Sequence, residues 1–236
     1  MYNEVKYDNE ILTLLRKLSD INIELTIEKS EDEKEILITA RTPSRSIAYE
    51  FKAPIDTFNF EGDDITFFDY KEFFTLFSVN DDPVIKQTEN TFEIIKDRSK
   101  LTYFLAEKEA TEGSEYDEYV EFDESHASFK LSAEKIKKFK TMIGLTNAED
   151  LTFKVSGNKI LTTLFYEVNQ PTYEEEFDLI EPATKDFEFI VDTEIIKLAP
   201  ENDYIIYLNA HGVIKLEYIN DNDIELNLFI AESEDD

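Results

Sequence analysis

Hydrophobic and polar residues alternate over several stretches of the chain. Between residues 21 and 28, isoleucine and leucine occupy every second position, with asparagine, glutamate and threonine between them. A period of two is typical of a β-strand with one buried face and one face in water, which is the usual condition in antiparallel sheets. The same alternation predicts antiparallel strands around Ile36/Ile38/Ala40, Ile47/Tyr49/Phe51, Leu101/Tyr103/Leu105, Leu151/Phe153/Val155, Ile214/Leu216/Tyr218 and Ile224/Leu226/Leu228/Ile230.

Four short segments show helical spacing instead, at residues 8–19, 70–79, 132–143 and 193–198. At or just before each start stands a residue whose side chain can accept a hydrogen bond from the first helical turn. These residues are Asp8, Asp69, Ser132 and Asp192, and Pro200 ends the last segment. Strands and helices together predict an α+β protein.

The two halves of the chain resemble each other. Residues 67–74 lead through an Asn-Asp-Asp turn into a strand, and residues 189–196 lead through Glu-Asn-Asp into another. An aperiodic acidic stretch separates the halves. We therefore predict a tandem duplication, with an N-terminal domain of residues 1–107, a linker of residues 108–126 and a C-terminal domain of residues 127–236. A chance echo within an ordinary α+β protein is the alternative.

The exposed faces of the predicted helices carry positive charge in an acidic protein. The chain has 24 Lys and Arg against 54 Asp and Glu, a formal net charge of -30. Such a charge repels phosphate at long range, but screening over about 8 Å lets a local basic face dominate nearby. In spite of this net charge, each of the four helices places Lys or Arg opposite its apolar side. The alternative explanation is that amphipathic helices commonly carry Lys on their exposed face. A basic lining within an acidic exterior is what a protein surrounding DNA requires.

Residues for catalysis or for cofactor binding are scarce. The chain has no Cys, and its five glycines form neither a phosphate loop nor a dinucleotide fingerprint. His126 and His211 stand apart in the sequence, which predicts surface positions and no metal site. We therefore expect no enzyme activity and no cofactor. Because abundant carboxylates form accidental pairs, a β-rich enzyme remains an alternative.

Several short segments carry a family resemblance. They are Leu14-Leu15-Arg16-Lys17 followed by Ile21-Asn22, FFTLFSVNDD at 73–82, IIKLAP at 195–200, and the ending Leu228-Phe229-Ile230-Ala231-Glu232. In these segments the chain resembles the DNA polymerase sliding clamps of T-even-like tailed phages and, more remotely, proliferating cell nuclear antigen. The resemblance implies two clamp-type domains in each subunit and three subunits in a ring. Antiparallel sheets would form the outside, and two short helices per domain would line a central hole.

The resemblance also assigns residues to three surfaces. The expected DNA-facing set is Arg16, Lys17, Lys71, Lys137, Lys138 and Lys197. The expected cleft for partner peptides contains Val120, Phe122, Pro200, Phe229 and Ala231, for which a plain core role is the alternative. The expected subunit interface contains Leu101, Tyr103, Leu105, Phe177 and Leu179.

The implied function is that of a processivity factor. A homotrimeric ring would surround double-stranded DNA without reading its sequence, tether the replicative polymerase, and depend on a separate ATP-driven clamp loader. The polar, acidic start and the lack of any long apolar segment predict a cytoplasmic protein without a membrane partner, in the host cytoplasm if it is phage-encoded. Whether transcription factors also bind stays open. The alternative from net charge alone is an acidic DNA mimic that blocks a DNA-binding partner.

Overall fold

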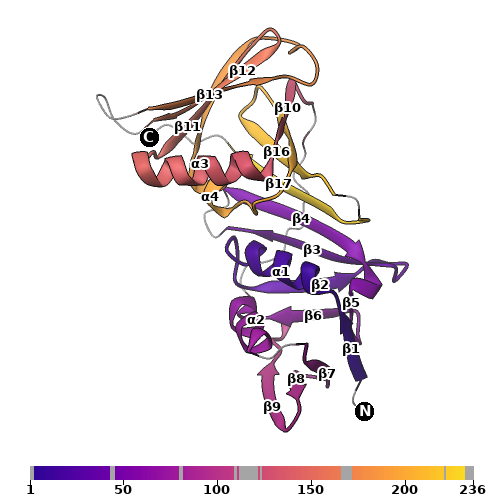
Figure 1. Cartoon of the computed structure of the whole chain (residues 1–236). Coiled ribbons are helices and arrows are strands. Elements are labelled where there is room, and N and C mark those ends of the chain that lie inside the picture. The colour runs from indigo at the N-terminus through magenta and orange to yellow at the C-terminus, as the bar shows by residue number, and fades with distance from the viewer. Residues whose placement is uncertain are drawn as a thin grey trace. The chain divides into compact units, whose positions relative to one another are not determined.

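The chain folds into two compact units (Figure 1). The computed structural model describes residues 3–42, 46–79, 82–108, 111, 122, 124–165, 172–220 and 222–231. The first unit is Met1–Arg45, Tyr49–Asp117 and Asp223–Glu225, and the second is Ser46–Ala48, Glu118–Asn222 and Leu226–Asp236. The predicted linker of residues 108–126 lies mostly outside the described residues.

The first unit alternates groups of strands with single helices. Its elements are β1 (Asn3–Tyr7), α1 (Asn9–Leu18), β2 (Leu25–Lys29), β3 (Glu35–Arg41), β4 (Ile47–Pro54), the 3-10 turn η1 (Ile55–Thr57), β5 (Phe58–Asn59), β6 (Asp64–Phe67), α2 (Tyr70–Ser78), β7 (Val84–Gln87), β8 (Thr91–Lys96) and β9 (Ser99–Phe104). The strands form the antiparallel runs β5-β1-β7-β8-β9 and β4-β3-β2-β6.

The second unit repeats this order without a counterpart of β5. Its elements are β10 (Ala127–Leu131), α3 (Ala133–Thr146), β11 (Asp150–Ser156), β12 (Lys159–Phe165), β13 (Tyr173–Asp178), β14 (Phe187–Asp192), α4 (Glu194–Leu198), β15 (Tyr204–Leu208), β16 (Val213–Tyr218) and β17 (Glu225–Ala231). Its strands form the antiparallel runs β10-β15-β16-β17 and β13-β12-β11-β14. Strand for strand, both runs match those of the first unit, so the architecture is an α+β fold of two similar halves.

The helices begin where their capping residues predict. The Asp8 carboxylate accepts from the backbone N–H groups of Glu10 and Ile11, and the Asp69 carboxylate accepts from that of Glu72. The Ser132 hydroxyl accepts from the Lys135 N–H in the same way. The last helix begins at Glu194, one residue later than predicted, and the Glu194 N–H donates to the Asp192 carboxylate at 2.7 Å.

Two further predicted boundaries differ from the structure. The alternation predicts a strand from residue 21, but β2 begins at Leu25 and Ile23 is 44% exposed. The Ile23 carbonyl instead accepts from the Tyr70 N–H at the start of α2. The third helix runs three residues beyond its predicted end at 143, because it continues through Gly144 to a left-handed cap at Asn147 with φ 52°.

Each unit has its own hydrophobic core. In the first, the rings of Phe67 and Phe73 lie 4.9 Å apart and both contact Phe92 and Tyr103. The core of the second unit is more aliphatic and encloses an apolar cavity of about 10 Å³ whose lining includes Phe129, Thr162 and Ile196. In each unit the core faces the inner side of the sheets and the apolar side of both helices, which leaves the outer helix faces to solvent.

Candidate nucleic-acid interface

In each unit the two helices lie side by side (Figure 1). The helices α1 and α2 contact each other in the first unit, as α3 and α4 do in the second. Their buried residues all point to the core, so the predicted basic residues share the opposite side within each unit. The structure thus brings together Arg16 and Lys71 in the first unit, and Lys17 follows Arg16 on α1.

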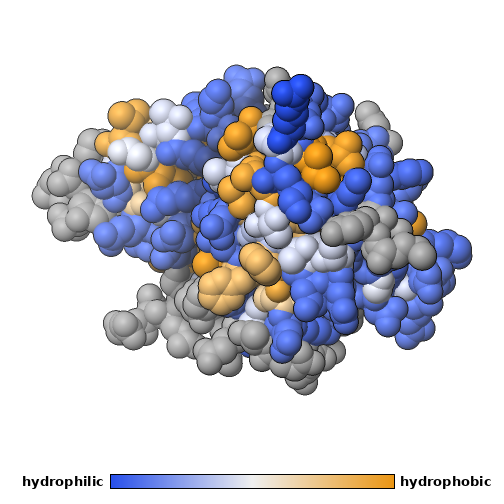
Figure 2. All heavy atoms as spheres, turned by 90° about the horizontal axis from the view of Figure 1, so that it is seen from below, coloured by the Kyte–Doolittle hydropathy of each residue, from blue (hydrophilic) through white to orange (hydrophobic). Residues whose placement is uncertain are grey.

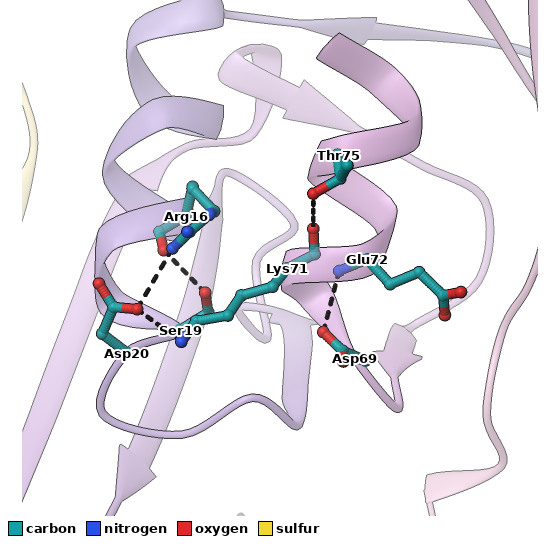
Figure 3. A network of polar contacts seen from close by, with 7 residues as sticks. All are labelled: Arg16, Ser19, Asp20, Asp69, Lys71, Glu72 and Thr75. Atoms are coloured by element: carbon teal, nitrogen blue, oxygen red, sulfur yellow. Dashed lines mark hydrogen bonds and ion pairs between the residues drawn. The ribbon is translucent and has the colours of Figure 1, made fainter. Parts of the chain in front are cut away.

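The basic residues of α1 and α2 are tied together by one carboxylate (Figure 3). Asp20 Oδ1 lies 2.6 Å from Lys71 Nζ and 3.3 Å from Arg16 Nη1. Both basic side chains are 36% exposed and that of Asp20 is 42% exposed, so water reaches all three. The Ser19 hydroxyl donates to the Arg16 carbonyl at 2.7 Å, which holds the end of α1 in place.

The α2 side of this group is ordered by its own helix start. The Glu72 N–H donates to Asp69 Oδ1 at 2.9 Å, and the Thr75 hydroxyl donates to the Lys71 carbonyl at 2.7 Å (Figure 3). These local bonds fix the backbone on which Lys71 stands, while its side chain reaches across to α1.

In the other unit a carboxylate also pairs with two basic side chains, but both belong to one helix. Glu175 on β13 forms ion pairs with Lys135 and Lys138 of α3, the latter at 3.5 Å. The Glu175 side chain is only 11% exposed, and the Tyr173 hydroxyl also donates to it. Lys138 Nζ lies 5.2 Å from the centre of the Tyr173 ring. Neither Asp20 nor Glu175 was identified from the sequence, because each is distant in the chain from a residue it pairs with.

The other three predicted DNA-facing residues are not paired in this way. Lys137 and Lys197 are exposed and Lys17 is partly exposed. Within the described residues, none of the three takes part in an ion pair. They are therefore the most available cations of the predicted set.

The edge strands β9 and β13 differ in charge. Lys100 on β9 and Arg98 in the turn before it are exposed, whereas β13 exposes Glu174, Glu176 and Asp178. Each strand stands at one end of its run and has a pairing partner on one side only among the described strands. An unpaired edge is a template for another strand.

The five predicted interface residues lie on these strands or directly after them, and two of the five are buried. Tyr103 is 5% exposed, and its hydroxyl donates to the Asp69 carbonyl at 2.9 Å. Leu179 is 7% exposed, while Leu101, Leu105 and Phe177 are half-buried. Sequence reasoning overlooked Phe104, which is 74% exposed at the end of β9. It lies on the opposite strand face from Tyr103, so the apolar alternation did not select it.

The predicted cleft residues are only partly described. Val120 lies outside the described residues, and Ala231 ends β17. Phe122 lies with its ring 6.5 Å from that of Tyr207. Pro200 is buried and Phe229 is 5% exposed, so both are packed away from solvent in this structure.

The histidines are not isolated on the surface as predicted. The rings of His126 and His211 lie 6.1 Å apart, and His126 is 9% exposed. His126 Nδ1 accepts from the Ala210 N–H at 3.3 Å. The described residues contain no group of three or more His, Asp or Glu side chains that could hold a metal ion.

Two surface features bear on other classes of function. The part of the first unit near β9 has a hollow of about 650 Å³ whose lining includes Glu61, Asp64, Glu89 and Glu107. The face shown in Figure 2 is mostly hydrophilic, with hydrophobic residues in small groups. In the described part of the chain, every helix is too short or too polar to cross a membrane.

The fold is that of the sliding clamps, and solved structures match the whole chain. The A. fulgidus PCNA, solved with the C-terminal region of FEN-1, is 15% identical with a TM-score of 0.72, and each chain covers 100% of the other. A PCNA2–PCNA3 complex from Sulfolobus tokodaii is 16% identical with a TM-score of 0.74, covering 98% of this chain and 99% of that one. An H. pylori beta clamp is 10% identical with a TM-score of 0.69, and covers 99% of this chain and 66% of its own.

No family model matches the chain, and no curated protein matches its sequence. At identities of 10–16% these structures establish the fold alone. The clamp fold expected from the sequence is confirmed, whereas the resemblance to phage clamps in particular stays a prediction.

Proposed function

We propose that this protein is a subunit of a sliding clamp that surrounds duplex DNA. The observation that carries the proposal is the clamp fold over the full chain, with paired basic helices in a protein of net charge -30. The DNA-facing residues would be Arg16, Lys17, Lys71, Lys137, Lys138 and Lys197. Short-range attraction to phosphates would centre the duplex without base contacts.

The ring would close through its edge strands. We infer that β9 of one subunit pairs with β13 of the next, which satisfies both open edges and joins Arg98 and Lys100 to an acidic strand. Two basic β9 edges would repel each other, as would two acidic β13 edges, so the contact would join unlike edges and be head-to-tail. Three such contacts would close the ring as a trimer. The S. tokodaii PCNA2–PCNA3 complex supports assembly from clamp chains.

The mechanism would be topological. A closed ring linked to DNA slides along it while a bound polymerase stays near the primer end at high effective concentration. The chain itself would catalyse nothing, and a separate ATP-driven loader would open the ring. A peptide cleft that includes Phe122 is supported by the A. fulgidus structure, which holds the C-terminal region of FEN-1. A phage replication setting follows from the sequence resemblance.

A charge-reversal experiment tests this function. Changing Lys17, Lys71, Lys138 and Lys197 to Glu should leave the mass in light scattering unchanged and abolish both duplex binding and polymerase stimulation. The matched control changes Lys34, Lys130, Lys154 and Lys185 to Glu, which alters net charge equally on strands and loops. Equal losses in both variants would mean that the helices do not face DNA.

The same samples separate the proposal from a DNA mimic, which the net charge favours. A mimic would be a monomer or dimer under all salt conditions and would inhibit a DNA-binding protein. A particle of three subunit masses with a central hole in electron micrographs would exclude it.

A further inference from the structure

The two halves of the fold repeat one electrostatic arrangement. In each unit a single carboxylate lies between two basic side chains, and these basic side chains stand on the helices proposed to face DNA. Asp20 joins Arg16 to Lys71, and Glu175 joins Lys135 to Lys138. The two carboxylates come from different structural contexts, a turn after α1 and the strand β13, so the arrangement does not follow from the duplication of a single sequence motif.

A carboxylate between two cations occupies the place that a phosphate would take. Arg and Lys bind carboxylate and phosphate oxygens through the same charge-assisted hydrogen bonds. The basic side chains in both groups are 36–49% exposed, so a phosphate has access to them. The Asp20 pairs are exposed on both sides and therefore weak, so an incoming anion competes with them on similar terms. Glu175 is only 11% exposed, so in the second unit the phosphate would approach from the side of the exposed lysines.

We propose that Asp20 and Glu175 reduce the attraction between the ring and DNA by occupying these cations when no phosphate does. This proposal rests on the function proposed above and concerns the regulation of the same surface. Lys17, Lys137 and Lys197, which form no ion pair with any described residue, then supply the steady attraction. The paired residues contribute only when a phosphate displaces their carboxylate. A lining of this kind retains the duplex while it keeps the energy barrier to each movement of the ring along the DNA low.

The removal of one negative charge tests the proposal. Asp20→Asn frees Arg16 and Lys71 for phosphate contacts, so binding to a short fluorescent duplex should become tighter and more salt-dependent. Each added phosphate contact steepens the slope of log K against log salt by about 0.9, an additional fall of about 3.5-fold between 50 and 200 mM salt. Diffusion of loaded rings along stretched DNA should become slower.

The matched control is Asp32→Asn. Asp32 pairs with the exposed Lys34 at 2.7 Å in the loop between β2 and β3, so this variant makes the same charge change away from the helices. Its salt slope should equal that of the unmodified protein. In the second unit, Glu175→Gln should act like Asp20→Asn, with Glu188→Gln, which breaks an exposed pair with Lys154, as its control.

The outcomes are distinct. If the unmodified ring binds DNA and Asp20→Asn has the same salt slope as Asp32→Asn, the proposal for the carboxylates is wrong and the clamp function stands. If Asp20→Asn lowers the melting temperature without changing the slope, Asp20 is a brace between α1 and α2 only, which also overturns the proposal. If the unmodified protein neither assembles nor binds the duplex, the clamp function itself fails.

Discussion

The two units have the same strand and helix order but different interiors. With the capping residues Asp69 and Asp192 aligned, Phe73 of α2 and Ile196 of α4 fall at the same position, and both are buried. Around Phe73 the core is a connected group of aromatic rings, whereas Ile196 lines a small cavity. The hydrophobic pattern and the capping residues therefore specify the topology, and the identity of the core side chains affects how tightly each unit packs.

The largest expected effect is on the aromatic core. Phe73→Ala should lower the free energy of unfolding by about 3–5 kcal/mol, because it removes a ring that contacts Phe67, Phe92 and Tyr103. Ile196→Ala should cost about 2–4 kcal/mol as the matched change in the second unit. Urea denaturation followed by circular dichroism measures both. If Phe73→Ala lowered the free energy of unfolding by less than about 1 kcal/mol, the tighter packing inferred for the aromatic core of the first unit would be contradicted.

A hydrogen bond present in the first unit gives the next effect. Tyr103→Phe removes a hydroxyl that donates to the Asp69 carbonyl at 2.9 Å and accepts from the Asp69 N–H at 3.2 Å. The cost should be about 1–3 kcal/mol, since the Asp69 N–H loses this acceptor and the Asp69 carbonyl keeps only the Phe73 N–H. Assembly measured by light scattering should not change. Loss of assembly at normal stability would instead give Tyr103 the interface role predicted from its sequence.

Capping residues should contribute similarly in both units. Asp69→Ala and Asp192→Ala should each cost about 1 kcal/mol, because each carboxylate accepts from a backbone N–H at the start of a helix. Thermal unfolding measures the two changes. A loss for one variant only would show that the shorter α4 depends on tertiary packing more than on its cap.

The smallest effect on stability is expected at the edge of β9. Phe104→Ser should change the free energy of unfolding by less than about 0.5 kcal/mol, since the ring is 74% exposed. It should weaken assembly if β9 forms the subunit contact, which sedimentation at a series of concentrations would detect. Phe165→Ser, at another partly exposed phenylalanine, is the control.

Much of the fold could be predicted because its signals are local. Alternation predicts the strands, and Asp8, Asp69 and Ser132 mark helix starts correctly. The basic side of each helix follows from spacing alone. The pairing of those cations could not be predicted, because Asp20 meets Lys71, and Glu175 meets Lys135, only after strands and helices have packed.

The same limit applies to the predicted interface, which stays a prediction, and explains the error at the histidines. Alternation separates two strand faces but does not tell which apolar face meets the core, so Tyr103 could not be distinguished from an exposed residue. His126 and His211 are far apart in sequence and become neighbours because β10 pairs with β15.

The first strand of each unit determines when that unit can fold. Asn3 pairs with Gln87 on β7, and Ala127 pairs with Leu208 on β15, so each opening strand waits for one that follows the second helix of its unit. On a ribosome, β1 can pair early with the short strand β5, but its longer pairing with β7 must wait until residue 87 has emerged. Pairing across such a separation closes a long loop and slows folding. Each unit should therefore form late and as a whole, with the first complete while the second is still being synthesised.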